Sequence, residues 1–284
     1  MAQFIYKNAN NEQLDLSNNE YFWLTNVDGQ TRAGAEIASD SNGFIDGDIV
    51  NNIKLQPRTI ILDLKIKKKE SVEIAKRTIL EVIKPKQKGY LLWTQDDRHV
   101  QIEGYIEAID MPRWTNGVVM QVTLHCSQPY WEDVQDVLQE ISDIIDLHYF
   151  TKSETDMLFF PINGLPMGYY NLPRTKKVSN YGDVAVGFVC EIIAYGEVVN
   201  PEIINEHGEY MKVNTTLMPN DVLRIETTRG KKSISKNGVN IINTLVAGST
   251  WLKIEPGHNE FTIGSDDENI NNMYYQIIYK QRYV

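Results

Sequence analysis

The chain has 284 residues, of which 42% are hydrophobic and 23% charged, and it carries a net charge of −10. Its length predicts about two domains, and its composition is typical of a folded globular protein rather than a disordered one. The acidic balance disfavours nucleic acid as a direct partner, because phosphate binding depends on a basic face.

Neither the first residues nor the apolar stretches carry a targeting pattern. The segment MAQFIYKNANNEQ lacks the basic and apolar regions of a secretory signal. The longest apolar candidate, residues 184–195, is interrupted by Glu191 and falls short of the roughly 18 residues of a membrane span. We therefore expect synthesis in the cytoplasm and no membrane partner.

Residues 27–48 are rich in Gly, Ser, Asp and Asn and follow neither the helical nor the strand period. We expect a long, mobile loop here, and loops of this length inside compact domains are usually functional or disordered. Asp40 and Asn42 hold the first and third positions of a calcium-binding loop, but Ile45 stands where that loop needs glycine. The segment therefore predicts turns rather than a metal site.

The remainder of the amino half predicts one helix on a mostly antiparallel sheet. Four stretches read as strands, at residues 59–67, 90–94, 100–109 and 118–126. After the first strand, Ser71 is placed to cap a helix that runs through about Ile83, and Pro85 is placed to stop it.

The middle of the chain predicts a helical linker at 132–155, between domains at 1–131 and 156–284. Its apolar residues recur at helical spacing, and they are Val134, Val137, Leu138, Ile141, Ile144 and Ile145. Such an amphipathic helix either packs on its own domain or forms a seam between subunits.

From Ser179 to Tyr283 the chain is a series of short alternating runs separated by turn signals, which predicts an all-β sandwich. Asn237-Gly238 lies between two of these runs and predicts a two-residue hairpin turn. Cys126 and Cys190 fall in phase with apolar neighbours, so we expect buried core thiols rather than a disulfide or a nucleophile.

No catalytic, cofactor-binding or metal-binding residue is predicted. The five histidines lack metal-ligand spacing, no serine lies in a G-x-S-x-G setting, and the carboxylate groups at 96–97 and 266–268 adjoin turns. We therefore predict that the protein is not an enzyme. Aromatic residues at 21–23, 169–170, 251 and 274–275 could stack on sugars or pack in cores, and alternation along a strand buries at least one of each adjacent pair.

Several short patterns, in order and spacing, together cover nearly the whole chain. In the amino half they include Asp46, Gly47 and Asp48 in DGDIV, the region from Gly89-Tyr90 to Tyr105, and Pro129, Tyr130 and Trp131 in LHCSQPYW. In the carboxyl half they are Asn180, Gly182, Asp183, Asn200, Pro201, Ile204, Asn205, Gly208, Thr227, Gly230, Gly238, Trp251, Pro256, Gly257 and Asn259. With these residues the chain closely resembles the distal tail protein family of tailed bacteriophages.

The resemblance implies a mainly β fold in two domains. The first would be a β-sandwich-like, ring-forming domain with one helix and an extended hairpin, and the second a galectin-like β-sandwich. It further implies a hexameric ring at the virion tail tip that joins the tail tube to the tip hub or baseplate and holds receptor-binding proteins. Subunit contacts are then expected in the 27–48 segment and in a hairpin near 88–105.

The tail so implied could be flexible, contractile or part of a headless bacteriocin. A competing interpretation is a carbohydrate-binding, lectin-like module of a tail or cell-surface protein. The well-organised amino half, which a simple lectin would not need, argues against it.

Overall fold

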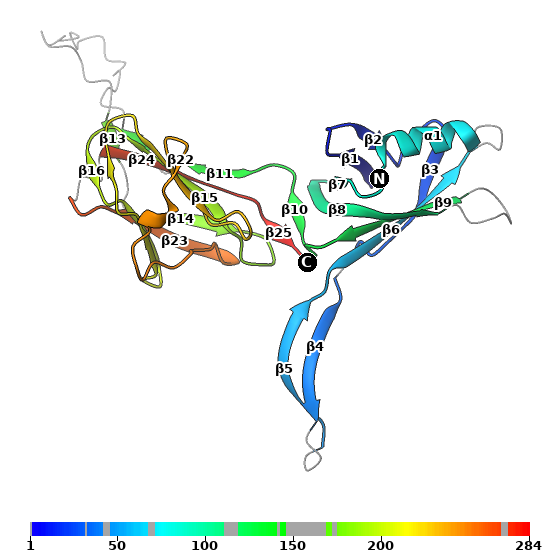
Figure 1. Cartoon of the computed structure of the whole chain (residues 1–284), viewed down its shortest axis with the longest axis horizontal. Helices are drawn as coiled ribbons and strands as arrows, with labels where there is room; N and C mark the ends of the chain where they lie inside the picture. Colours follow the sequence, from blue (N-terminus) through cyan, green and yellow to red (C-terminus); the bar gives the residue numbers. More distant parts are fainter. Residues whose placement is uncertain are drawn as a thin grey trace, which may run out of the picture. The chain divides into compact units, whose positions relative to one another are not determined.

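The computed structural model describes residues 2–31, 33–41, 46–67, 72–110, 119–140, 143–145, 169–171, 175–267 and 272–284. The chain divides into two compact units (Figure 1). The N-terminal unit comprises Met1–Gln135 together with Arg282–Val284, and the C-terminal unit comprises Asp136–Gln281. The C-terminal unit is therefore an insertion in the N-terminal unit, placed before the last strand of that unit.

A nine-stranded antiparallel sheet organises the N-terminal unit, in the order β2-β1-β7-β8-β9-β6-β3, with β10 pairing both β8 and β25. Its strands are β1 (Gln3–Asn8), β2 (Gln13–Asp15), β3 (Phe22–Asp28), β6 (Arg58–Ile66), β7 (Lys88–Gln95), β8 (Arg98–Asp110), β9 (Val119–Cys126), β10 (Trp131–Asp133) and β25 (Arg282–Tyr283). The predicted strands at 59–67, 90–94, 100–109 and 118–126 are β6, β7, β8 and β9, and they are confirmed.

Burial on one face explains why these strands were readable. In β6, Leu62 and Leu64 are fully buried while Asp63 and Lys65 are partly exposed, so the period of two is visible in the sequence. Helix α1 (Val72–Val82) buries Ala75 and Ile79 against the same core, which confirms the predicted helix. Its proposed cap, Ser71, lies outside the described residues.

The segment predicted as a loop at 27–48 contains strand residues, and the loop prediction is wrong for them: residues 27–28 end β3, and residues 35–41 and 48 belong to a hairpin. Strands β4 (Ala35–Ser41) and β5 (Asp48–Leu55) form a separate two-stranded antiparallel hairpin that extends away from the nine-stranded sheet (Figure 1). Every residue of β4 is exposed, so neither face of this strand is buried within the unit. Without a buried face, the sequence shows no clear alternation of apolar and polar residues. Residues 42–45, between the strands, are outside the described ranges.

The hairpin expected near 88–105 is real but is not the extended one. It consists of β7 and β8, and these lie inside the sheet, where β1 pairs with β7 and β9 pairs with β8. Because both outer edges already carry strands, the backbone of this hairpin is not free for another subunit. Of the two predicted contact segments, β4–β5 is the exposed one.

The C-terminal unit is a β-sandwich. One sheet has the order β11-β24-β15-β20-β21-β22 and the other β14-β23-β17-β18. Their strands are β11 (Val137–Glu140), β14 (Thr175–Asn180), β15 (Phe188–Ala194), β17 (Glu202–Asn205), β18 (Tyr210–Lys212), β20 (Val222–Glu226), β21 (Ser233–Lys236), β22 (Val239–Asn240), β23 (Gly257–Gly264) and β24 (Met273–Tyr279). The core lies between the sheets, where the rings of Phe188 and Phe261 are 5.4 Å apart.

Smaller elements complete this unit. Two short strand pairs are β12 (Asp143–Ile145) with β13 (Tyr169–Asn171), and β16 (Val198–Val199) with β19 (Thr216–Leu217). A 3-10 turn, η2, spans Ile242–Thr244. The predicted Asn237-Gly238 turn is confirmed, since both residues have positive φ, 51° and 80°, and join β21 to β22.

The helix predicted inside the 132–155 linker is wrong for its described residues. Val137–Glu140 is strand β11, which pairs with β24 along its length. Val137 packs against the sandwich core while Leu138 is 51% exposed, which is a strand alternation hidden within helix-like spacing. The edge of β24 supplies backbone hydrogen bonds to residues 137–140, and these bonds favour a strand over a helix here. Residues 146–155 lie outside the described ranges.

Both cysteines are buried core thiols, as predicted. Burial raises the pKa of the Cys126 thiol and of the Cys190 thiol to about 12, so neither is ionised near neutral pH. Cys126 is in β9 of the N-terminal unit and Cys190 is in β15 of the C-terminal unit, so each unit holds one.

Candidate functional site

The β4–β5 hairpin carries an exposed apolar surface. Ile37 pairs directly with Ile53, and Val50 pairs with Ser39, which lies two residues from Ile37 and so on the same face. Ile37, Val50 and Ile53 are 59%, 54% and 62% exposed. We call these three residues the apolar hairpin face.

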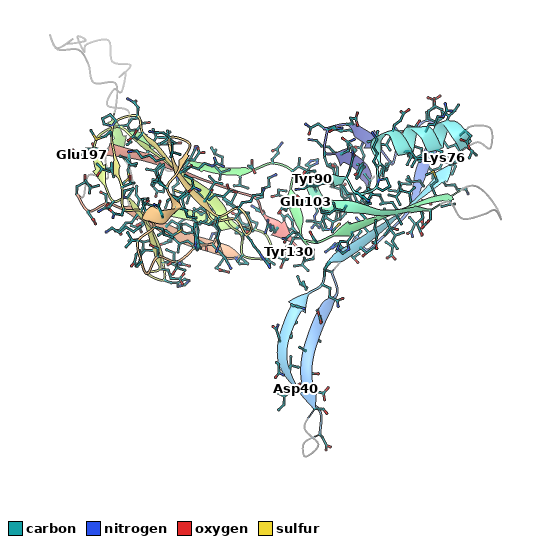
Figure 2. All side chains as sticks on the ribbon, in the orientation of Figure 1. Asp40, Lys76, Tyr90, Glu103, Tyr130 and Glu197 are labelled. Carbon is teal, nitrogen blue, oxygen red and sulfur yellow. The ribbon has the colours of Figure 1, made fainter. Side chains whose placement is uncertain are left out.

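The opposite face of the hairpin is mostly polar, with one exposed aliphatic residue, Ile49, which pairs with Asp40. Glu36 and Lys54 form an ion pair at 3.0 Å, and Asn51 Nδ2 donates to Asp40 Oδ2 at 2.6 Å. Figure 2 labels Asp40 near the far end of the hairpin, with side chains projecting on both sides. A two-stranded hairpin with one uncovered apolar face is marginally stable alone in water, and exposed apolar patches mark interaction sites. The apolar hairpin face is therefore a candidate interaction surface.

The signature residues of the amino half lie at the two ends of this hairpin. Asp46 and Gly47 precede β5, whose first residue, Asp48, accepts a hydrogen bond from Ser39 Oγ at 3.3 Å. Pro129 and Trp131 are buried beside the other end, and Trp131 Nε1 donates to the carbonyl of Gln30 at 3.1 Å. Tyr130, between them, is partly exposed (Figure 2).

In the C-terminal unit the signature residues shape turns. The buried amide of Asn180 donates to the carbonyls of Val184 at 3.0 Å and Ile254 at 3.2 Å, and its Oδ1 accepts from Gly182 N at 2.9 Å. Asp183 follows in the same turn. One side chain thereby bonds three backbone groups of this turn region, and the carbonyl of Ile254 also accepts from Val186 N at 3.0 Å.

Two further asparagines of the set act in the same way. Asn200 has a positive φ of 52° and donates to Asp266 Oδ2 at 2.7 Å, and the carbonyl of Pro201 after it accepts from Val213 N. Asn259 accepts from Glu255 N at 2.8 Å and donates to the carbonyl of Glu255 at 2.7 Å, holding the loop that contains Gly257. These residues position loops rather than reactive groups.

Asn205 makes a set of turn hydrogen bonds that Asn8 repeats in the described part of the N-terminal unit. Its Oδ1 accepts from the backbone N–H of His207 and of Glu209, and its amide donates to the Glu209 carboxylate at 2.8 Å. Asn8 makes the same bonds to the backbone of Asn10 and Glu12 and to the Glu12 carboxylate. The shared pattern, NANNE at 8–12 and NEHGE at 205–209, closes β1–β2 and β17–β18 and was not recognised in the sequence.

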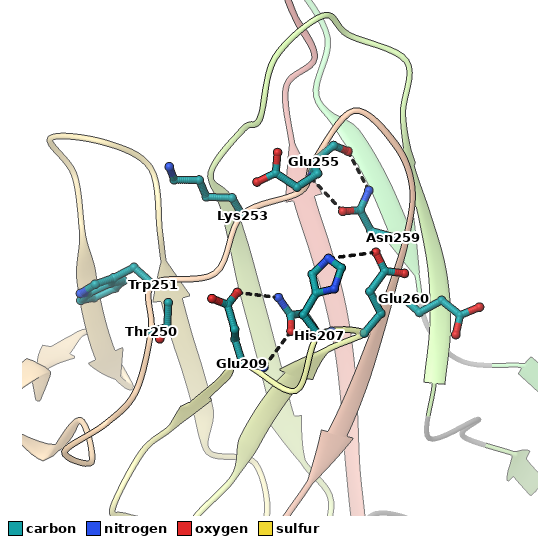
Figure 3. A pocket seen from close by; sticks show the side chains of 10 residues that line it. His207, Glu209, Thr250, Trp251, Lys253, Glu255, Asn259 and Glu260 are labelled. Atoms are coloured by element: carbon teal, nitrogen blue, oxygen red, sulfur yellow. Dashed lines mark hydrogen bonds and ion pairs between the residues drawn. The ribbon is translucent and has the colours of Figure 1, made fainter. Parts of the chain in front are cut away.

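A polar pocket of about 210 Å³ lies between that 205–209 turn and the loop before β23 (Figure 3). It is lined by Asn205, Glu206, His207, Glu209, Thr250, Trp251, Lys253, Glu255, Asn259 and Glu260. The two signature amides in it are engaged in the turns just described. The indole of Trp251 points away from the other labelled side chains and faces Lys232 Nζ at 5.1 Å from its ring centroid. The pocket therefore offers a sugar ring no obvious aromatic platform.

The other aromatic candidates follow the predicted alternation where their side chains are described. Phe22 is fully buried whereas Trp23 is 40% exposed and lies 5.9 Å from Lys65 Nζ. Tyr275 is fully buried and Tyr274 is partly exposed. The side chains of Tyr169 and Tyr170 are outside the described set.

Across the described ranges, no three His, Cys, Asp or Glu side chains gather as a metal site would require. Nor does any helix in those ranges have the length and apolar character of a bilayer crossing.

Comparison with known proteins identifies the class. Residues 181–283 match the family described as siphovirus-type tail component, C-terminal domain. The whole chain is similar to the crystal structure of the Dit protein of phage SPP1, with a TM-score of 0.72, 11% identity and 99% of each chain covered.

Two baseplate structures of phage p2 are also similar. The activated conformation with Ca matches at a TM-score of 0.53 and 10% identity, covering 99% of this chain and 98% of that one. The activated conformation with Sr matches at 0.51 and 11% identity, covering all of both. No curated protein sequence matches the chain.

Fold and family model together define a structural component of a phage tail. Its residues 181–283 match the siphovirus-type tail component family, and the resemblance to distal tail proteins drawn from the sequence is confirmed. The mainly β fold that the resemblance implied is confirmed as well.

Proposed function

We propose that six copies of this chain close into a ring at the distal end of a phage tail. The ring would join the tail tube to the tip hub or baseplate and hold peripheral, host-recognising proteins. The family of residues 181–283 and the likeness to SPP1 Dit, described as a paradigm of the hub adsorption apparatus in phages infecting Gram-positive bacteria, support this role. The role is structural and requires no catalytic group.

The observation that carries the proposal is the apolar hairpin face. A ring is made by heterologous contacts, in which one surface of each copy meets a different surface of the next until rotation closes the set. The hairpin suits such a contact because it extends from its sheet and presents on one face three of its four exposed large aliphatic side chains. Burying them on a neighbour would remove apolar area from water.

The test is assembly of the chain with this face altered. In the variant Ile37→Thr/Ile53→Thr both side chains become polar while the β-branching that suits a strand is retained. We expect the unmodified chain to form six-fold rings by light scattering and negative-stain electron microscopy. The variant should remain monomeric with a melting temperature unchanged within about 2 °C, because exposed positions contribute little to the fold.

The matched control is Glu36→Thr/Lys54→Thr, which alters the polar face of the same hairpin and should leave ring formation intact. A ring that forms equally well from both variants would remove the hairpin from the interface. An unmodified chain that stays monomeric both alone and with purified tail-tube protein would overturn the ring itself.

A further inference from the structure

The root of the β4–β5 hairpin consists of two strand crossings that differ in stiffness. The return crossing, from β5 to β6, passes through Gln56-Pro57. Proline fixes its own φ and restricts the residue before it, and Gln56 N also donates to the carbonyl of Gly34 at 2.8 Å. This side of the root is stiff by covalent structure.

The outgoing crossing, from β3 to β4, begins with glycine. Gly29 has a φ of +78°, and a Cβ placed on it would lie 2.0 Å from the carbonyl oxygen of Thr59, so only glycine fits. A second glycine, Gly34, ends the same crossing. Because glycine restricts the backbone least, Gly29 and Gly34 do not by themselves fix the direction in which the chain leaves β3. That direction therefore depends on contacts with other residues.

Apart from the bond between Gln56 N and the Gly34 carbonyl, the side-chain contacts of this crossing centre on the carbonyl of Gln30. Arg58 Nη1, at the start of β6, donates to the carbonyl of Gln30 at 2.8 Å and more weakly to that of Gly29 at 3.4 Å. Trp131 Nε1, at the start of β10, donates to the same Gln30 carbonyl at 3.1 Å. The outgoing crossing is thus bonded to two different strands of the nine-stranded sheet.

Burial of the Arg58 guanidinium at this position is energetically unfavourable. It is 2% exposed, and among the described residues neither its Nε nor its Nη2 has a hydrogen-bond partner. Burial lowers the pKa of the guanidinium, which means that the fold destabilises the charge. A buried charge with unsatisfied donors gives weak support to stability, whereas a buried polar group can specify one geometry among several.

We propose that Arg58 and Trp131 are positioning residues that fix the direction of the hairpin relative to the nine-stranded sheet before any partner is bound. The consequence for assembly rests on the ring function proposed above. A contact held in one orientation loses less conformational entropy when it docks, so it binds more tightly for the same area. The orientation itself is a property of the single chain and can be tested without a ring.

The experiment measures the distance between a spin label on the hairpin and one on the sheet. Cysteines replace Asn52 in β5 and Glu107 in β8, both exposed, while the native Cys126 and Cys190 have 0% exposure and should not react. Below the concentration of any assembly, we expect a single narrow distance distribution by double electron–electron resonance.

Four substitutions then separate an effect on hairpin direction from an effect on folding. Arg58→Met and Trp131→Phe remove the two donors and should each broaden the distribution, by at least twofold in width when combined. Arg58→Lys returns one donor to the Gln30 carbonyl and should recover part of the narrow width. Arg77→Met, on the exposed side of α1, removes a guanidinium elsewhere and should change nothing.

The melting temperature of each variant is measured alongside. A narrow distribution that survives in the folded double variant would overturn the proposal, as would a broad one in the parent protein. A failure of the ring function alone would look different, since the parent would show the narrow distribution and yet remain monomeric at high concentration.

Discussion

At the scale of single residues, asparagine amides position several turns of the described part of this protein. Asn180, Asn200, Asn205 and Asn259 each bond groups in a neighbouring turn or loop, and Asn8 repeats one of these arrangements in the other unit. An amide can donate and accept at once without the desolvation cost of a charge, which suits positions beside a core. The signature of this chain is therefore one of backbone geometry.

Asn180→Ala tests that interpretation. The substitution removes the side-chain partner of the Val184 carbonyl and of the Gly182 N–H, while the carbonyl of Ile254 keeps its bond from Val186 N. A buried unsatisfied group costs about 1–3 kcal/mol. We expect the C-terminal unit to lose about 2 kcal/mol or more of unfolding free energy by differential scanning calorimetry. Asn214→Ala, at an exposed asparagine of the same unit, is the control and should shift the transition by less than about 0.5 kcal/mol. Equal shifts would deny Asn180 its special role.

At the scale of elements, the last strand of the N-terminal unit is held by unusually varied contacts. Tyr283 in β25 pairs with Trp131 in β10, and Arg282 forms an ion pair with Glu132. The guanidinium of Arg98 lies 5.0 Å from the Tyr283 ring and 5.1 Å from the Trp93 ring. Cation–π contacts of this kind contribute about 0.5–1 kcal/mol each at exposed sites.

Tyr283→Ala should therefore loosen β10 without unfolding the sheet. We expect the amides of Trp131–Asp133 to exchange about tenfold faster with deuterium, since tenfold corresponds to about 1.4 kcal/mol. Tyr181→Ala removes a tyrosine that is 74% exposed and should leave exchange in β10 unchanged. Exchange that is slow in both variants would show that β25 does not protect β10.

The same scale shows what could be predicted from the sequence. Strands such as β6 were readable because one face is buried, and α1 because Ala75 and Ile79 face the core. The strands β4 and β5 were missed because neither is buried. Strand β11 was missed because its apolar residues, Val137 and Leu138, also fit the helical spacing of the neighbouring apolar residues. Local burial, rather than the presence of an element, decided which pattern was visible.

The candidate site was less predictable than the fold. Predicting the apolar hairpin face would have required knowing that Ile37 and Ile53 pair across a hairpin, and the sequence does not show that strand register. The anchors at its root could not be found either, since Arg58 and Trp131 bond to a backbone carbonyl and no side-chain pattern identifies that acceptor. Only the Asn-to-Glu spacing of the two turns had a usable signal in the sequence.

At the scale of the whole molecule, each unit carries a buried acid that should make it sensitive to alkali. The folded pKa is about 12 for Cys126 and Cys190, raised from 9.0, and about 12 for Tyr6, raised from 10.0, because burial disfavours the anions. The unfolded chain therefore releases these protons first as pH rises. The contribution of each thiol to stability is complete below about pH 9 and is lost between pH 9 and 12, and that of Tyr6 is lost between pH 10 and 12.

The expected slope is about 1.4 kcal/mol per pH unit for each group across that window. In Cys126→Ala/Cys190→Ala, melting temperatures measured from pH 8 to 11 should fall less steeply than in the parent, whatever their starting values at pH 8. The single variants should flatten only the transition of the unit that holds the altered thiol. Parallel curves for parent and double variant would contradict the assignment.

The insertion of one unit within the other also has a consequence for synthesis. A ribosome completes residues 1–135 and then the whole C-terminal unit before it reaches Arg282 and Tyr283. Strand β10, which carries one anchor of the hairpin root, thus lacks its outer partner until translation has passed the C-terminal unit. A chain interrupted anywhere in residues 136–281 lacks β25 and leaves that edge of β10 unpaired, so β10 gains its outer partner only after the C-terminal unit has been translated.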